Sequence, residues 1–226
     1  MRATVAIAGL ALIVGLGGCS SSSDSGTGGE SASPTAEASP SSALPADAKT
    51  FTSDKYGFSF QYAPPFEEKS DTTWQAESEA SAADTVAVFD VEGTQVGGQY
   101  RDAFVVNTYQ LNTEITDENL DQVATELEQN VIPQLEQSSD EMQISELVST
   151  EVNGLKGFQA DATFSVDGTP MSSTLYFLFD GDLEFQLLTQ SATDRWEELQ
   201  PTFTAMVDSF QVSGEPAAAA TESPAA

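Results

Sequence analysis

Aromatic residues are confined to one part of this chain, and this confinement determines where a core can form. All 13 Phe, 2 Trp and 5 Tyr residues fall between residues 47 and 213. Large apolar side chains supply most of the surface that folding buries, so we expect one globular domain over residues 47–213. The segments 20–46 and 214–226 consist mainly of Ser, Gly, Pro, Ala and acids and are expected to be a disordered tether and a disordered tail.

Alternating apolar residues predict the first strands of this domain. Residues 56–62 (YGFSFQY) place an aromatic side chain at every second position, so all four would project from one face of a strand. Pro64 and Pro65 should end that strand, because proline donates no hydrogen bond to a ladder. Residues 85–91 and 103–111 are rich in β-branched and aromatic side chains and also predict strands.

Three Asx-Gly pairs predict tight turns in the second half of the domain. They are Asn153–Gly154, Asp167–Gly168 and Asp180–Gly181, and such pairs suit the positive φ angles of a hairpin turn. The strands expected around these turns form an antiparallel meander and cover residues 143–151, 157–166, 171–179 and 183–190.

Two helices are predicted from apolar residues at helical spacing. Residues 116–118 open the first helix, which Pro133 should kink or end near Ile132. Asp194 should cap the second helix, which Pro201 should split into a turn and a main helix. The expected fold is therefore α+β, with an antiparallel sheet of about seven strands covered by two helices.

The N-terminus predicts export and lipid attachment. Arg2 precedes a 13-residue apolar run, residues 3–15, which is too short for a stable transmembrane helix and indicates a signal peptide over residues 1–18. The sequence LGGCS at residues 16–20 resembles the bacterial lipobox, in which the Cys is acylated and becomes the mature N-terminus. Cys19 is therefore predicted to carry the lipid, and residues 19–46 to be the lipidated tether. The alternative is an ordinary signal peptide with an incidental Cys.

Charge and missing residue types exclude several functions. The chain has 36 acidic and 7 basic residues, a net charge of -29, which argues against nucleic-acid binding because phosphate contacts need clustered Lys and Arg. It has no His, and Cys19 is its single Cys. Ser-His-Asp hydrolysis, Cys-His proteolysis, common zinc sites, haem or iron–sulfur ligation and thiol redox chemistry each need one of these residues. Carboxylate chemistry, a hard-cation site or no catalysis remain.

The acidic residues do not define a catalytic or metal site. Glycoside hydrolysis uses two carboxylates about 5 to 10 Å apart, but no spacing in this sequence distinguishes one such pair. Residues 180–184 (DGDLE) lack the spacing of a calcium loop and are interpreted as a hairpin turn with solvated acids. Asp117, Glu118 and Asp121 are interpreted as an exposed helix start. We therefore predict no catalytic residue, no metal site and no cofactor.

Two long connections are the candidate binding segments. Residues 67–84 carry Trp74 within a polar stretch, and residues 92–102 carry Tyr100 and Arg101. Long connections in a compact domain are often functional. Trp74, Tyr100 and Arg101 are therefore the predicted ligand- or partner-binding residues. The alternative for Trp74 is packing against the edge of the core.

The domain resembles a known family at three places. Residues 51–66 (FTSDKYGFSFQYAPPF) resemble the opening of PsbP-like domains, where an aromatic strand runs into a turn that contains Pro. The hairpin at Asn153–Gly154 and the ending MVDSF at residues 206–210 are similar to later parts of the same domains. The resemblance covers residues 50–212. The sequence departs from the usual pattern at residues 63–66 (APPF), where these domains have Pro followed by Gly and Trp.

The resemblance to PsbP-like domains, combined with a lipobox and a Ser-rich tether, suggests the LpqN-like envelope lipoproteins of actinobacteria. It implies a lipoprotein held by its N-terminal lipid on the extracytoplasmic face of a bacterial cell membrane. The domain would bind a small ligand or another envelope protein in a non-catalytic, accessory role. The alternative is a carboxylate-dependent envelope enzyme that acts on a glycan. The resemblance supplies no catalytic motif for these positions and does not identify the ligand or partner.

Overall fold

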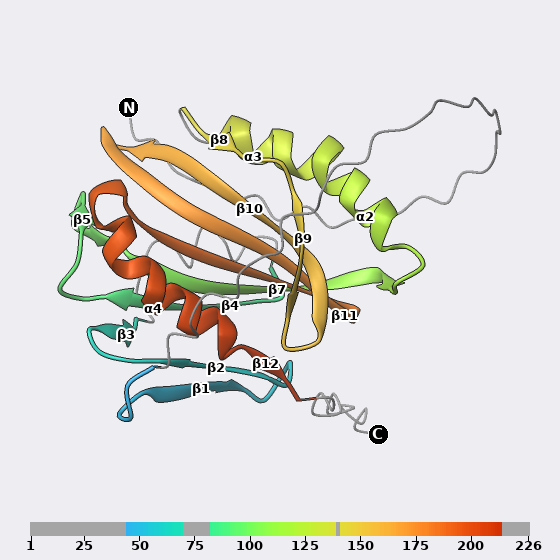
Figure 1. Ribbon diagram of the computed structural model, residues 1–226, viewed down its shortest axis with the longest axis horizontal. Coiled ribbons are helices and arrows are strands. Elements are labelled where there is room, and N and C mark those ends of the chain that lie inside the picture. The colour runs from blue at the N-terminus through green and yellow to red at the C-terminus, as the bar shows by residue number, and fades with distance from the viewer. Residues whose placement is uncertain (1–43, 70–81, 139–140, 214–226) are drawn as a thin grey trace, which may run out of the picture.

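The computed structural model describes residues 44–69, 82–138 and 141–213 and contains one large and two small sheets (Figure 1). The strands of the large sheet are β3 (Phe66–Glu68), β4 (Asp84–Asp90), β7 (Ala103–Ile115), β8 (Gln143–Ile144), β9 (Val148–Val152), β10 (Leu155–Val166) and β11 (Thr169–Ala192). They follow the order β3-β4-β7-β11-β10-β8, and β9 also pairs with β10. Every pairing between these strands is antiparallel, so the expected α+β fold with a seven-stranded sheet is confirmed.

Two smaller sheets flank the large one. One has the order β1-β2-β12 and consists of β1 (Lys49–Ser53), β2 (Phe58–Tyr62) and β12 (Gln211–Val212), so it joins the two ends of the domain. The other is a hairpin of β5 (Gln95–Val96) and β6 (Gln99–Tyr100), which forms part of the long connection at residues 92–102.

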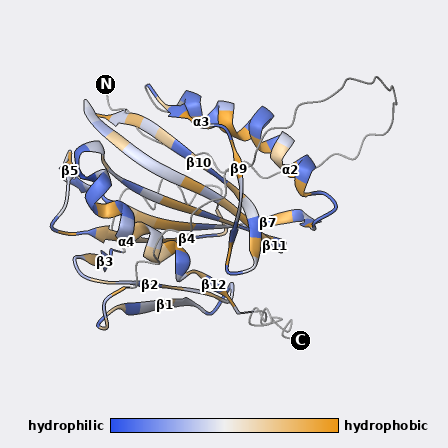
Figure 2. Ribbon diagram, in the orientation of Figure 1, coloured by the Kyte–Doolittle hydropathy of each residue, from blue (hydrophilic) through white to orange (hydrophobic). Residues whose placement is uncertain are grey.

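Helical segments cover both faces of the large sheet. On one side α2 (Leu120–Glu126), the π-helix η1 (Leu127–Val131) and α3 (Ile132–Ser138) form one continuous helical run. Hydrophilic and hydrophobic residues alternate along this run (Figure 2). On the other side the 3-10 turn η2 (Thr193–Arg195) leads into α4 (Trp196–Asp208). In the described part of the chain, none of the helices has the length and apolar character needed to cross a membrane.

Side-chain alternation in β11 divides the core between the two faces. Phe177 and Phe179 pack with the apolar side of α2, η1 and α3. Leu178, which lies between them, points the opposite way and packs with α4 and β2. Successive residues of a strand face opposite sides of a sheet, so one strand serves both helical layers.

The aromatic strand was placed in the wrong sheet by the sequence prediction. Phe58, Phe60 and Tyr62 alternate as expected and are all buried, but β2 belongs to the small β1-β2-β12 sheet rather than to the main sheet. Tyr56 lies in the turn before β2 and is only partly buried. The strand begins at Phe58 because Gly57, with a φ of 65°, completes the turn from β1.

Pro133 does not end the first helix, and Pro201 does not split the second. Pro133 neither ends the first helix nor interrupts it, since it is the second residue of α3 and directly follows η1, whose wider π turns accommodate the missing N–H. Pro201 lies inside α4 without splitting it. Pro201 is exposed, so water can satisfy the carbonyl that loses its partner, while buried Leu199 and Phe203 hold the opposite face of the helix.

The predicted cap of the second helix is also wrong. Asp194 lies within η2, and the N-cap position of α4 is Arg195, with no side-chain capping hydrogen bond. The additional 3-10 turn moves the start of the α-helix beyond Asp194.

Two of the expected strands differ in detail. Residues 143–151 form two short strands, β8 and β9, rather than one. Residues 169–192 form β11 without a break. The chain reverses its direction at Gly181, whose φ is 61°, so β11 has two arms. Its two arms lie side by side, because the Oγ of Ser172 is 3.0 Å from the Oγ1 of Thr193. The first arm pairs with β10 and the second with β7, so no separate loop follows Asp180.

Truncating Phe58, Phe60 or Phe210 to Ala is expected to lower the free energy of unfolding by about 3 to 5 kcal/mol each. These side chains are 1%, 0% and 0% exposed, and the Phe58 ring lies 5.6 Å from those of both Phe185 and Phe210. Chemical denaturation measures the loss.

The matched control is Gln61→Ala, on the exposed face of the same strand, which should change the stability by less than about 0.5 kcal/mol. Trp74 lies outside the described residues, and Trp74→Ala is expected to cost little. A loss at Trp74 as large as at the three phenylalanines would assign Trp74 to the core and remove it from the candidate binding residues.

Candidate functional site

The structure describes two of the four residues singled out in the sequence. Cys19 and Trp74 lie outside the described residues. Tyr100 ends β6, is partly buried, and its ring centroid lies 6.4 Å from that of Phe89. Arg101 follows it, is 8% exposed, and donates from Nη2 to the Oε1 of Gln99 at 2.9 Å. Tyr100 is therefore packed against the β4–β7 part of the sheet, whereas the Arg101 side chain bonds back to the β5–β6 hairpin, and the binding role of both stays a prediction.

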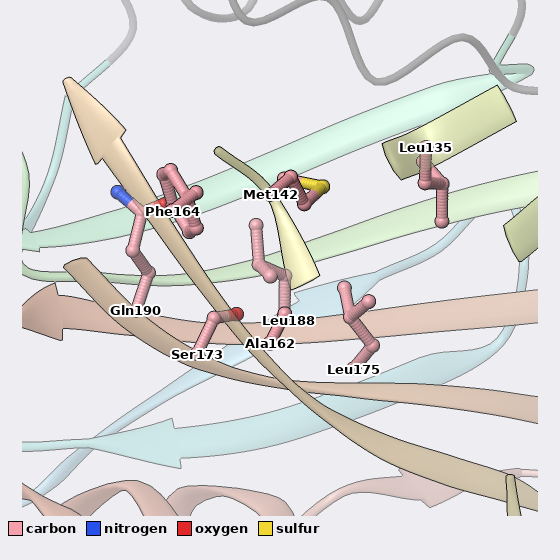
Figure 3. Close-up of a pocket in the computed structure, with 8 residues that line it drawn as sticks. All are labelled: Leu135, Met142, Ala162, Phe164, Ser173, Leu175, Leu188 and Gln190. Carbon is pink, nitrogen blue, oxygen red and sulfur yellow. The ribbon is translucent and has the colours of Figure 1, made fainter. Parts of the chain in front are cut away.

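An apolar pocket lies between α3 and the large sheet (Figure 3). Its cavity volume is about 20 Å³, which is room for about one water molecule. Its lining comes from α3, the residue before β8, β10 and both arms of β11, and comprises Leu135, Met142, Ala162, Phe164, Ser173, Leu175, Leu188 and Gln190. Six of these eight side chains are apolar and none is charged.

The pocket lies between three separate groups of packed core side chains. Leu175 packs against both the group under the helices and the group around Leu188 and Val105. Met142 packs against the helical group and against a third group that includes Phe164. Ala162 contributes only a methyl group to the lining, so no large side chain fills the space between these groups.

One end of the pocket is polar. Ser173 and Gln190 come from the two arms of β11, and both are buried, at 2% and 4% exposure. Gln190 donates from Nε2 to the carbonyl oxygen of Arg101 at 2.8 Å, so the connection that carries the predicted binding residue also orients the pocket wall. Among the described residues, the Ser173 Oγ has no hydrogen-bond partner. A buried hydroxyl without a partner loses the hydrogen bonds that water would supply.

A buried carboxyl group lies further along the same face of β11. Glu184, Gln186, Leu188 and Gln190 are spaced two apart and therefore share one face. Glu184 is 2% exposed and accepts a hydrogen bond from Gln186 Nε2 at 2.8 Å. Burial raises the pKa of Glu184 from 4.5 to about 7, against the opposing effect of that hydrogen bond.

Tyr109 lies directly opposite Glu184 in the pairing of β7 with β11. It is 5% exposed, and its hydroxyl has no hydrogen-bond partner among the described residues. Burial raises the pKa of Tyr109, and the charge of Glu184 adds to this effect. Tyr109 is therefore a neutral phenol at physiological pH.

Two other buried acids share one arginine. Asp90 and Asp102 are both 0% exposed, and Arg195 pairs with both, at 2.9 Å from Nη2 to the Asp90 Oδ2. Asp102 also accepts hydrogen bonds from the backbone N–H groups of Thr94 and Ala192. This cluster, Asp90–Asp102–Arg195, joins β4, β7, the end of β11 and the start of α4.

Each of the three buried acids described above is held by another side chain. Asp90 and Asp102 are both bound to Arg195, and Glu184 is hydrogen-bonded to an amide. Within residues 44–69, 82–138 and 141–213, no three His, Cys, Asp or Glu side chains are grouped so that they could hold a metal ion.

Sequence reasoning missed Glu184, Tyr109, Ser173 and the pocket. The sequence LEFQLLTQ at residues 183–190 carries one usable signal, because two polar residues alternate with Phe185 and Leu187 in a strand that is otherwise apolar. A strand buried on both faces is normally apolar throughout, so polar residues on one face indicate a special environment. Nothing local indicates that Ser173 and Gln190 meet.

Comparison with known proteins supports the fold. No family model and no curated protein sequence matches this chain. A solved structure from Bacteroides thetaiotaomicron is similar over 74% of this chain and 49% of its own, with 14% identity and a TM-score of 0.48, so the chain spans about half of that protein. Cyanobacterial PsbP from Synechocystis is similar over 75% of this chain and 95% of its own, with 14% identity and a TM-score of 0.52.

LpqN, which is involved in cell envelope biogenesis of Mycobacterium tuberculosis, is also similar, over 74% of this chain and 86% of its own. The identity is 10% and the TM-score is 0.49. At these identities the similarity concerns the fold, and the fold is PsbP-like, as the sequence resemblance implied.

The buried Glu184 should make the stability depend on pH. Its pKa is about 7 in the folded protein and near 4.5 when exposed, so the folded state binds more protons between these values. The contribution of this group to stability is therefore fully present below about pH 4.5 and is lost as the pH rises to about 7. The loss is on the order of 3 kcal/mol.

Glu184→Gln, which keeps the acceptor and removes the charge, is expected to be more stable than the wild type at pH 8 and similar to it at pH 4.5. Urea denaturation at both pH values measures the difference. Glu136→Gln, at an exposed position of α3, is the control and should follow the wild type. Equal effects of the two substitutions would contradict a buried, proton-binding Glu184.

Proposed function

We propose that this chain is a lipoprotein anchored by its N-terminal lipid to the extracytoplasmic face of a bacterial cell membrane. Its PsbP-like domain would bind a small ligand or an envelope protein in a non-catalytic, accessory role. The observation that carries this proposal is the lipobox-like sequence LGGCS at residues 16–20, which holds the single Cys of the chain.

The anchoring part of the proposal is supported by the sequence. Cys19 is the single Cys of the chain and stands at the position that a lipobox requires. A Ser-, Gly- and Pro-rich segment follows it and would give the domain a flexible connection to the membrane surface.

The non-catalytic part is supported by the way in which the buried acids are used. Asp90 and Asp102 both pair with Arg195, and each also accepts a backbone hydrogen bond. A general acid and base pair needs two carboxyl groups that face the substrate. The net charge of -29 also disfavours nucleic acid as a partner.

Cys19→Ala is expected to abolish incorporation of labelled fatty acid into the protein and to release it from the membrane fraction. A single acyl-cysteine would be the membrane attachment, so its loss removes the anchor. Metabolic labelling and membrane fractionation measure the two effects. The control Ser20→Ala, at the next position, should keep both the label and the membrane location. Labelling of the Cys19→Ala protein would contradict the lipobox assignment.

A second assay separates binding from catalysis. The full chain incubated with isolated envelope glycan is expected to release no reducing ends above the buffer rate. Release that is lost in Glu184→Gln would support the alternative, a carboxylate-dependent enzyme, because Glu184 is the acid whose pKa suits proton transfer near neutrality.

A further inference from the structure

We propose that the small β1-β2-β12 sheet is the side of the domain that lies against the anionic phospholipid headgroups of the membrane, while the helical run of α2, η1 and α3 faces away. This inference rests on the proposed anchoring at Cys19 and adds an orientation to it. Three observations support it: the place where the tether joins the domain, the distribution of the lysines, and the uncharged outer face of the small sheet.

The tether joins the domain beside the small sheet. Residues 20–43 separate the predicted lipid site from Leu44, which packs against the core group that includes Phe58 and Phe210. The edge strand β1 begins five residues later, at Lys49. A flexible Ser- and Gly-rich segment of this length spans roughly 25 to 30 Å on average. The anchor therefore keeps the domain close to the lipid surface and draws on it from the side of the small sheet.

Three of the four lysines of the chain lie at this end of the domain. Lys49, Lys55 and Lys69 fall within residues 44–69, which also hold four acids, so this segment is nearly neutral. Residues 116–138, which form the helical run and its entry, hold six acids and no Lys or Arg. The small sheet and the helical run lie at opposite edges of the domain (Figure 1). An anionic surface therefore repels the helical run more strongly than the small sheet and orients the run away from the lipid.

The charges of Lys49 and Lys55 are not used in ion pairs with other described residues. Lys49 begins β1, Lys55 lies two residues beyond its end, and both are exposed. Their Nζ atoms lie 5.9 Å from the ring centroid of Tyr62 and 4.7 Å from that of Tyr56. Exposed contacts of this kind are weak and the Lys side chain is flexible, so both ammonium groups can reach a lipid phosphate.

The outer face of the small sheet is polar but carries no charged side chain in its three described strands. Thr50 and Thr52 of β1 lie beside Gln61 and Ser59 of β2, and Gln211 of β12 pairs with Ser59 from the other side. All of these except Ser59, which is half-buried, are exposed. In a protein with a net charge of -29, such a face can approach anionic headgroups without repulsion, and its hydroxyl and amide groups can donate hydrogen bonds to phosphate oxygens.

The experiment measures which end of the domain lies nearer the lipid. The chain from Ser20 onward keeps every described residue, carries a polyhistidine tag in place of residues 1–19, and is attached through this tag to vesicles that contain nickel-chelating lipid. The remaining sequence has no His and no Cys, so the tag is the attachment and one introduced Cys is the labelling site. A fluorophore is placed at Thr52→Cys on the small sheet or at Gln129→Cys, an exposed position of the helical run, and is quenched by nitroxide on the lipid headgroups.

On vesicles of phosphatidylglycerol and phosphatidylcholine, the fluorophore at residue 52 should be quenched at least about twofold more than that at residue 129. The difference should shrink on phosphatidylcholine alone, and also when NaCl is raised from about 0.1 M to about 1 M, which shortens the screening length from about 10 Å to about 3 Å. The double substitution Lys49→Gln, Lys55→Gln should reduce it too. Lys156→Gln, which removes an exposed lysine that pairs with Asp117, is the matched control and should not reduce it.

Equal quenching at the two residues, or stronger quenching at residue 129, would overturn the proposed orientation. A preference for residue 52 that stays unchanged on neutral vesicles and at high salt, or in the double Lys variant, would overturn the role of anionic headgroups. The salt comparison needs no substitution, so a variant that fails to fold does not decide the result. The tag supplies the attachment independently of acylation at Cys19, so failure of this orientation is distinguishable from failure of the anchored role.

Discussion

The position of α4 over the main sheet depends on Arg195, whose guanidinium pairs with two fully buried carboxylates. Asp90 ends β4 and Asp102 immediately precedes β7, so one side chain at the start of α4 fixes two neighbouring strands. Removing one partner from a buried ion pair leaves an uncompensated charge, which typically costs about 3 to 5 kcal/mol. Close packing adds a second constraint, because a Cβ at Gly93 would overlap the Asp102 Oδ2 and the Arg195 Nη1.

The Asp90–Asp102–Arg195 cluster is also connected to the pocket. Asp90 and Asp102 bracket the connection that contains the β5–β6 hairpin and Arg101. The carbonyl of Arg101 accepts the hydrogen bond that orients Gln190, and Gln190 forms the polar end of the pocket beside Ser173. The sequence prediction therefore selected a segment that contributes to the candidate site, but through its backbone rather than through the guanidinium of Arg101.

The parts of the fold that were predicted correctly depend on local signals. The alternation at residues 58–62 and the turns at Asn153–Gly154 and Asp167–Gly168 need only neighbouring residues, and the three turn residues Asn153, Asp167 and Gly181 all have positive φ. Pro133 does not end its helix and Pro201 does not split its helix, because a π turn and the burial of one helix face outweigh a local propensity. The pairing of Arg195 with Asp90 and Asp102 spans 105 and 93 residues, and no local pattern indicates it.

The two faces of the main sheet use the same strand for different purposes. On the face toward α4, β11 contributes Phe185 and Leu187, which pack among aromatic rings and stabilise the fold. On the opposite face the same strand places Glu184 and Gln190 among buried residues, where polar groups reduce stability unless they find partners. Stability alone would favour apolar side chains at these positions. Both side chains have such partners, since Glu184 accepts from Gln186 and Gln190 donates to the carbonyl of Arg101, so each of these two buried polar groups depends on a neighbouring residue for its stability.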